Sequence, residues 1–110
     1  MYCRLYIHCS SVKSIIVLLK KKFGCSTKKM NCYCFQDFDV IFDMNEETNY
    51  NKMRTYPDGF LYYELKAELE IYNDYIQITD QILKLLWDNK ILAVVSCDYE
   101  EELNRYIFSL

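Results

Sequence analysis

The chain has 110 residues, a length typical of one domain, so we expect a single domain spanning residues 1–110. Hydrophobic residues make up 52% of it, and only two glycines and one proline are present, which argues against a disordered or linker-rich chain. No apolar run approaches the ~20 residues that cross a bilayer, and the first residues lack the pattern of a secretory signal peptide. We therefore expect a cytoplasmic protein that is not associated with a membrane.

The formal net charge of −3 conceals an uneven distribution of charge along the chain. Residues 1–36 carry seven Lys and Arg residues and no acidic residue, whereas residues 37–110 carry six Lys and Arg against sixteen Asp and Glu. An asymmetry of this kind indicates a charged surface that attracts a partner of opposite charge.

The strands and helices of the first half follow from residue periodicity. Residues 2–9 alternate between apolar and polar side chains and predict a half-buried strand. Ser10 and Ser11 are candidate N-caps for a helix over residues 11–23, whose apolar residues recur at helical spacing and which Gly24 ends. Residues 30–44 alternate again and predict a second strand.

The second half predicts a strand, a helix and a strand in that order. A polar loop over residues 45–57 and a Pro-Asp-Gly turn precede a long alternating strand over residues 60–72. A helix follows, from Asp74, which with Gln77 has the spacing of a capping box, to about Asn89. The apolar residues 91–97 predict the last strand, and the tail over residues 98–110 predicts a short helix or an added strand.

The resulting order is β-α-β-β-α-β, the order of the ferredoxin-like, or split βαβ, fold. We therefore expect an α+β domain in which two helices cover one face of an antiparallel sheet and leave the other face open.

The cysteines are candidates for buried thiols, disulfides or metal ligands. They are Cys3, Cys9, Cys25, Cys32, Cys34 and Cys97. Without an export signal free thiols are the default, and alternation places Cys3 and Cys9 on a core face. Cys32 and Cys34 are separated by one residue, which is too close for the usual C-x₂-C zinc motif, and His8 is the only histidine. We expect free thiols and no metal or other cofactor, with disulfides and a metal site as alternatives.

Residues typical of catalysis are present without a recognisable arrangement. His8 is a candidate general base, but we cannot place a nucleophile such as Cys34 or Cys97 beside it. Gly24 and Gly59 are isolated, so neither a P-loop nor a dinucleotide-binding motif is present. Carboxylates on an open sheet face lack the cleft that paired acid–base catalysis needs. We expect a protein that is not an enzyme.

Acidic residues and tyrosines are predicted to share the open face of the sheet, and this mixture is typical of a protein interface. Tyrosine rings provide contact area at low entropic cost, and carboxylates steer a basic partner. The predicted partner-binding residues are Asp37, Asp39, Asp43, Tyr62, Glu64, Glu68 and Glu70.

RNA binding is an alternative, because the RNA recognition motif shares this order of elements and places aromatic residues on its third strand. Phe60 and Tyr62 occupy such positions. Glu64, Glu68 and Glu70 share their face and would repel phosphate, so we regard a nucleic-acid partner as the weaker prediction.

One part of the chain resembles a known group of proteins. Residues 86–90 (Leu-Trp-Asp-Asn-Lys) lead into residues 93–103, a predicted strand followed by Cys-Asp-Tyr-Glu at residues 97–100. The sequence Phe-Leu-Tyr-Tyr stands at residues 60–63. This combination is similar to small uncharacterised bacterial and phage proteins, over roughly residues 60–103. The resemblance implies no activity. Small acidic domains of this kind occur as toxin immunity and anti-defence proteins, an analogy of size and charge.

Three hypotheses follow. The first is an inhibitor of the immunity or anti-defence type that binds a basic protein, such as a toxin or nuclease. The second is an RNA-binding module that uses the lysines of residues 20–29. The third is a ferredoxin-like homodimer that acts as a ligand-binding or regulatory domain.

Overall fold

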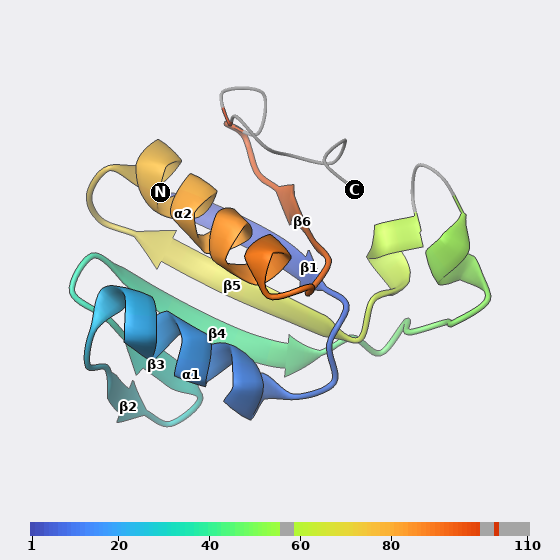
Figure 1. The fold of residues 1–110 in the computed structure, drawn as a ribbon, viewed down its shortest axis with the longest axis horizontal. Helices are drawn as coiled ribbons and strands as arrows, with labels where there is room; N and C mark the ends of the chain where they lie inside the picture. Colours follow the sequence, from blue (N-terminus) through green and yellow to red (C-terminus); the bar gives the residue numbers. More distant parts are fainter. Residues whose placement is uncertain (56–58, 100–102, 104–110) are drawn as a thin grey trace.

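The computed structural model describes residues 1–55, 59–99 and 103, and it is an α+β domain. Two helices lie on the same side of a six-stranded antiparallel sheet with the strand order β2-β3-β4-β5-β1-β6 (Figure 1). The strands are β1 (Tyr2–Ile7), β2 (Thr27–Lys29), β3 (Cys32–Cys34), β4 (Phe38–Met44), β5 (Leu65–Ile71) and β6 (Ala93–Ser96). The helices are α1 (Val12–Phe23), α2 (Tyr75–Asp88) and the 3-10 helices η1 (Lys52–Arg54) and η2 (Gly59–Tyr62).

The predicted first strand and first helix are confirmed as β1 and α1. The hydroxyl of Ser11 accepts a hydrogen bond from the backbone N–H of Ser14 at 3.2 Å, so Ser11 is the N-cap. Three lysines occupy the last turn of α1, where the helix dipole favours cations. Gly24 ends the helix at φ +90°, a backbone conformation that side chains with a Cβ rarely adopt.

The prediction of one strand over residues 30–44 is wrong, because the chain reverses direction within it. β3 and β4 pair with each other in antiparallel register, and the backbone N–H of Phe35 donates to the carbonyl of Phe38 in the turn between them. The rings of Phe35 and Phe38 stack with centroids 4.8 Å apart, which holds the turn against the core. β2 was not predicted. A turn at Met30, with φ +55°, joins it to β3, and neither turn contains the glycine that usually marks a hairpin.

The strand predicted over residues 60–72 is shorter than expected, because its first part is the 3-10 helix η2. The side-chain amide of Asn45 donates to the carbonyls of Leu61 and Tyr63, at 2.8 Å each, and occupies groups that a longer strand would pair. Gly59 packs so closely on the turn before it that an added Cβ would lie 2.1 Å from the carbonyl oxygen of Met53. These contacts favour the compact 3-10 turn over extended backbone.

The second helix and last strand are confirmed as α2 and β6. The capping box predicted at Asp74 is not formed, because Asp74 adopts a left-handed conformation and its side chain makes no capping hydrogen bond. Within the predicted tail, the structure describes residues 98, 99 and 103. The short helix or added strand predicted for the tail lies outside the described residues.

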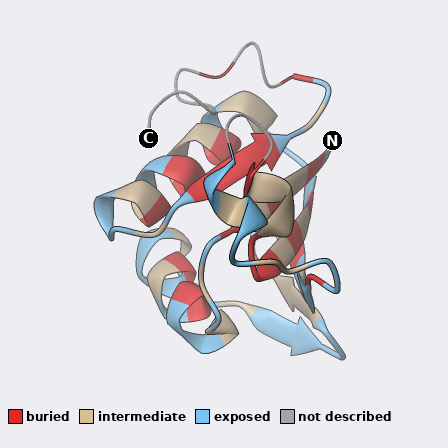
Figure 2. Ribbon diagram, turned by 90° about the vertical axis from the view of Figure 1, so that its right-hand side faces the viewer, coloured by how far each residue is buried: buried red, intermediate tan, exposed pale blue. Residues whose placement is uncertain are grey.

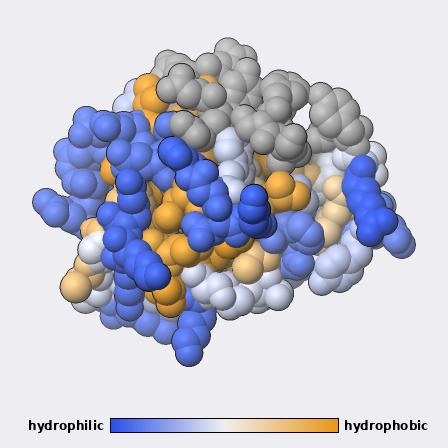
Figure 3. Space-filling view, viewed as in Figure 1, coloured by the Kyte–Doolittle hydropathy of each residue, from blue (hydrophilic) through white to orange (hydrophobic). Residues whose placement is uncertain are grey.

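The core lies between the helices and the sheet face that they cover (Figure 2). Alternate residues of β1, β4 and β5 point into it, as do buried residues of α1, α2 and β6. The largest fully buried side chains are Phe38, Leu5, Ile7, Ile15, Leu65, Leu69, Ile71, Ile82, Leu83, Leu86, Val40 and Val94. On the helix side, hydrophilic side chains flank an apolar strip between the two helices (Figure 3).

The α+β class is confirmed, but the sheet has six strands where four were predicted. The two additional strands, β2 and β3, form a hairpin that extends the sheet beyond β4. Among the described residues, no helix is both long enough and apolar enough to span a membrane.

Candidate functional site

The face of the sheet turned away from α1 and α2 carries most of the predicted partner-binding residues. We call it the outer face. Strand register places its residues, because side chains alternate between the two faces of a strand. From β4, β5 and β1 they are Asp39, Ile41, Asp43, Lys66, Glu68, Glu70, Tyr2, Arg4 and Tyr6. Acidic side chains therefore outnumber basic ones on this face.

Two of the predicted acidic residues are partnered across strands. Arg4 donates to Oε1 of Glu68 at 2.7 Å, and the two residues are opposite each other in the β1–β5 register. The Arg4 hydrogen bond holds the pKa of Glu68 below its usual value. The N-terminal ammonium lies 3.2 Å from Oε2 of Glu70. Because both pairs are partly exposed to water, each contributes little to stability.

Asp39 and Asp43 are the outer-face acidic residues of β4, which lies between β3 and β5 in the sheet. The hydroxyl of Tyr72 donates a hydrogen bond to Oδ2 of Asp39, and this bond is the main reason that the pKa of Tyr72 is raised to about 12. Asp43 is exposed and stands opposite Lys66 in the register with β5. Exposed apolar and aromatic side chains lie among these acids: Tyr2 is 51% exposed, Tyr72 57% and Ile41 38%.

Three predicted residues lie off the outer face. Asp37 lies in the turn between β3 and β4, where its carboxylate accepts a hydrogen bond from Asn73 at 3.3 Å. Tyr62 belongs to η2, and the ammonium of Lys52 stands 5.2 Å from its ring centroid. Glu64 precedes β5 and is buried, with 8% of its surface exposed. The prediction that Tyr62 and Glu64 share one exposed strand face with Glu68 is therefore wrong.

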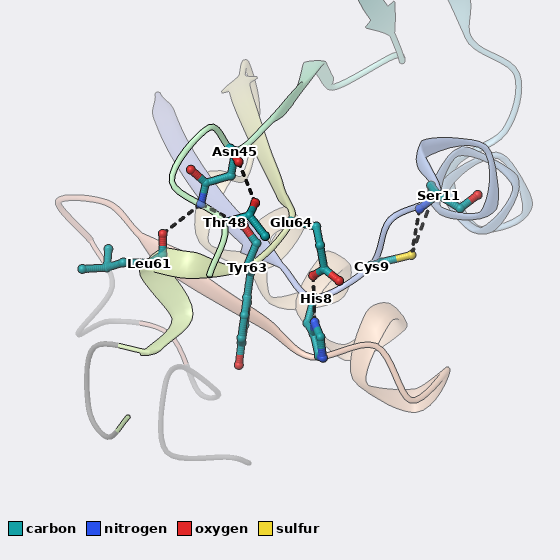
Figure 4. A network of polar contacts seen from close by, with 8 residues as sticks. All are labelled: His8, Cys9, Ser11, Asn45, Thr48, Leu61, Tyr63 and Glu64. Carbon is teal, nitrogen blue, oxygen red and sulfur yellow. Dashed lines mark hydrogen bonds and ion pairs between the residues drawn. The ribbon is translucent and has the colours of Figure 1, made fainter. Parts of the chain in front are cut away.

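Glu64 instead forms a polar pair with His8 (Figure 4). Nδ1 of His8 lies 2.7 Å from Oε1 of Glu64, and the imidazole stacks on Tyr63 with ring centroids 5.1 Å apart. His8 follows Ile7 and Glu64 precedes Leu65, and Ile7 and Leu65 form the last β1–β5 pair, so the antiparallel register places His8 and Glu64 opposite each other. Sequence analysis missed this pair, although the alignment of the two strands would have revealed it.

An imidazole held by a buried carboxylate has the arrangement of a general base with its orienting group. Such a base needs a nucleophile or a bound substrate within hydrogen-bond reach. Cys9 points away from His8 and makes its contacts with Ser11, with Sγ 3.5 Å from the backbone nitrogen (Figure 4). In the described part of the chain no hydroxyl or thiol is hydrogen-bonded to His8. The contact between His8 and Glu64 therefore joins the ends of β1 and β5.

Asn45 is the second buried polar centre near the end of β5. Besides donating to two carbonyls, Asn45 accepts the backbone N–H of Glu47 on its Oδ1 at 3.1 Å. The hydroxyl of Thr48 donates to the backbone carbonyl of Asn45 at 2.6 Å (Figure 4). Asn45 thus connects the end of β4 to η2, and its amide group is fully hydrogen-bonded.

No disulfide joins any of the six cysteines, all of which lie in the described part of the chain. Cys3 is buried in the core and Cys9 packs against its edge, which confirms the face predicted for Cys3. Cys32 and Cys34 lie on the outer face beside Asp39. Partial burial, the neighbouring Cys32 thiol and the Asp39 carboxylate raise the pKa of Cys34 to about 11. These three side chains are the described residues whose geometry suits a metal ion.

The lysines of the alternative RNA-binding hypothesis occupy two neighbouring elements. Lys20, Lys21 and Lys22 form the last turn of α1, and Lys28 and Lys29 lie on β2. All five are exposed. Lys28 and Lys29 therefore belong to the edge strand of the sheet, whereas the other three lysines belong to the helix layer.

Comparison of the chain with protein-family models, with curated proteins and with solved structures finds no match. The suspected similarity to small bacterial and phage proteins is therefore untested, and the function has to be argued from the site.

Proposed function

We propose that this protein is a non-enzymatic inhibitor of the immunity or anti-defence type, which binds a basic protein such as a nuclease through the outer face of its sheet. One observation carries the proposal: exposed Tyr2, Ile41 and Tyr72 stand among the carboxylates of β4 and β5 on a face that neither α1 nor α2 covers.

The exposed rings and the acidic side chains have different parts in such an interface. Tyrosine and isoleucine provide the apolar area whose burial stabilises a complex, and residues of this type carry most of the binding energy in protein interfaces. The carboxylates of Asp43 and Glu70 give the face its negative potential, which accelerates encounter with a basic surface and makes association sensitive to salt. The proposed binding surface therefore contains Tyr2 and Tyr72, and it no longer contains Tyr62 and Glu64.

We also propose that β4, β5, β1 and β6 together with α1 and α2 constitute a ferredoxin-like unit. These four strands are adjacent in that order, and the β2–β3 hairpin adds to the β4 edge. The hairpin widens the outer face, so a partner could contact more of it than a four-stranded sheet would offer. In this proposal the hairpin helps to determine which partner fits.

The proposal can be tested by reversing charges on the outer face. The double variant Asp43→Lys/Glu70→Lys changes two exposed carboxylates, and Asp88→Lys changes an exposed carboxylate on α2, on the helix side of the sheet. Each immobilised protein is exposed to a lysate of the cells that contain it, and bound proteins are released by increasing salt.

We expect the wild type and Asp88→Lys to retain the same basic protein, and the double variant to lose it. Isothermal titration with the purified partner then gives the loss of affinity, which we expect to exceed tenfold, about 1.4 kcal/mol. Retention of the same proteins by all three forms, or capture of no basic protein, would contradict the proposal.

A second candidate function is nucleic-acid binding through Lys20, Lys21, Lys22, Lys28 and Lys29, because these five exposed cations lie on adjoining elements. Lysine–phosphate contacts make affinity fall steeply with salt. Filter binding with single-stranded RNA at low salt tests it, with Lys21→Glu/Lys28→Glu as the variant. No retention by the wild type would exclude this function.

A third candidate is a homodimer formed through the outer face, as predicted for a ferredoxin-like regulatory domain. Sedimentation at several concentrations separates it from the first proposal. If the protein is a dimer and Asp43→Lys/Glu70→Lys disrupts it, the outer face binds a second copy of the chain and not a different protein.

A further inference from the structure

Two thiols and one carboxylate meet on the outer face where β3 pairs with β4. Cys32 and Cys34 are two residues apart in one strand, so their side chains are on the same face. Asp39 is the cross-strand partner of Cys34. Their sulfur atoms and a carboxylate oxygen of Asp39 all lie within 4.8 Å of one another, and all three residues are half-buried.

The distance between the two sulfur atoms is that of a tetrahedral metal site. Sγ of Cys32 lies 3.8 Å from Sγ of Cys34. Two thiolates bound to one tetrahedral zinc ion at about 2.3 Å have their sulfur atoms about 3.8 Å apart. A carboxylate oxygen at about 2.0 Å from the same ion would be about 3.5 Å from each sulfur. The carboxylate oxygen of Asp39 already lies within 4.8 Å of both sulfur atoms, close to that third ligand position.

Neighbouring residues hold this cluster in place from both faces of the sheet. The hydroxyl of Tyr72 donates to Oδ2 of Asp39, the kind of hydrogen bond that orients a metal-binding carboxylate. Tyr33, between the two cysteines, points to the opposite face, and its ring packs edge-on against Phe42 with centroids 6.1 Å apart. The backbone that carries both thiols is therefore anchored to the core.

We propose that Cys32, Cys34 and Asp39 form a binding site for a thiophilic, tetrahedral divalent ion of the zinc type. Two thiolates favour a soft or borderline ion over Mg²⁺ or Ca²⁺, which bind oxygen ligands. Three ligands come from the protein, and the fourth position is open to water or to a group of another molecule. The metal-site proposal does not rest on the inhibitor function, although Asp39 and Tyr72 lie on the same face.

This proposal takes up the metal site that the sequence left as an alternative, in place of the expectation that the chain binds no metal. That expectation rested on the spacing of Cys32 and Cys34, which is one residue shorter than in the C-x₂-C zinc motif. In a strand the same spacing brings both thiols to one face, and the third ligand comes from the neighbouring strand. Asp39 joins the set only through the β3–β4 register.

Titration of the reduced, full-length protein with Co²⁺ tests the site, because Co²⁺ adopts zinc geometry and its thiolate bonds absorb in the near ultraviolet. We expect one equivalent to bind, with the visible bands of a tetrahedral complex, and Zn²⁺ to displace it. Cys32→Ser and Cys34→Ser should each abolish these bands. Asp39→Asn keeps both thiols and should weaken binding at least tenfold, and Tyr72→Phe should weaken it about tenfold.

Cys25→Ser is the matched control, because Cys25 is an exposed thiol outside the cluster. We expect it to bind Co²⁺ like the wild type. Circular dichroism confirms that each variant is folded before it is titrated. The proposal is wrong if the reduced wild type binds no Co²⁺ at micromolar concentration, or if folded Cys32→Ser and Cys34→Ser retain the thiolate bands. Loss of the bands in Cys25→Ser would overturn it as well.

Discussion

Nδ1 of His8 lies 2.7 Å from Oε1 of Glu64, at the end of the β1–β5 pairing. Residues that are 56 positions apart in the chain thus form a polar pair that the strand register alone brings together. Because Glu64 is buried, removal of His8 leaves its carboxylate without this hydrogen-bond partner, and the cost of that loss exceeds the cost of breaking an exposed pair.

We expect His8→Ala to lower the free energy of unfolding by ~1–3 kcal/mol, because it leaves a buried carboxylate without its hydrogen-bond partner. Urea unfolding of the wild type, His8→Ala, Glu64→Ala and the double variant gives the coupling energy, which we expect to exceed ~1 kcal/mol. Lys84→Ala, which breaks the exposed pair with Asp88, is the control and should cost no more than ~0.5 kcal/mol. A coupling energy near zero would show that His8 and Glu64 act independently.

The Arg4–Glu68 pair predicts a dependence of stability on pH. The pKa of Glu68 in the folded protein is lowered, chiefly by the Arg4 hydrogen bond, relative to the unfolded chain. Its stabilising contribution is therefore complete above the unfolded pKa, near ~4.3. It is lost as pH falls from there through the folded pKa.

Urea unfolding at pH 6 and at pH 3 should show that Glu68→Gln loses less stability on acidification than the wild type does. The difference should be ~1 kcal/mol or less, because both side chains are about one-third exposed. Glu46→Gln, at an exposed loop position, is the control and should follow the wild type. An equal loss in Glu68→Gln and the wild type would mean that the pair does not contribute.

We expect Asn45→Ala to destabilise the protein by ~1–3 kcal/mol, because it leaves the carbonyls of Leu61 and Tyr63 without their donor. Hydrogen exchange should accelerate most around η2, where these bonds hold the backbone. Asn31→Ala at the exposed tip of the β2–β3 hairpin is the control and should change stability by less than ~0.5 kcal/mol. Unchanged exchange at η2 would refute the anchoring role of Asn45.

The two glycines predict different costs of substitution by alanine. In Gly59→Ala the Cβ would lie 2.1 Å from the carbonyl oxygen of Met53, so the backbone of η1 or η2 has to move. In Gly24→Ala the Cβ meets no atom within 4 Å, and the cost is backbone strain at φ +90°, ~1–3 kcal/mol. We expect Gly59→Ala to lower the midpoint of thermal unfolding more than Gly24→Ala. The reverse order would contradict the close packing at Gly59.

The features predicted correctly depend on neighbours in sequence. Alternation over residues 2–9, helical spacing over residues 11–23 and 74–89, and a serine N-cap before the first helix each involve positions within a few residues of one another. The β2–β3 hairpin was missed because its turn contains Met30 and Asn31 and no glycine. The strand predicted at Phe60 was wrong because Asn45, 15 positions earlier, holds that segment as η2.

Sequence alone determined that this chain is an α+β domain with a basic first third and an acidic remainder, because composition and periodicity are properties of the chain itself. Only the tertiary structure decided which side chains meet. It paired His8 with buried Glu64, removed Tyr62 and Glu64 from the predicted surface, and brought Asp39 beside Cys32 and Cys34. The physical reason is strand register: a shift by one residue moves every side chain to the opposite face, and the register is set by packing of the whole sheet.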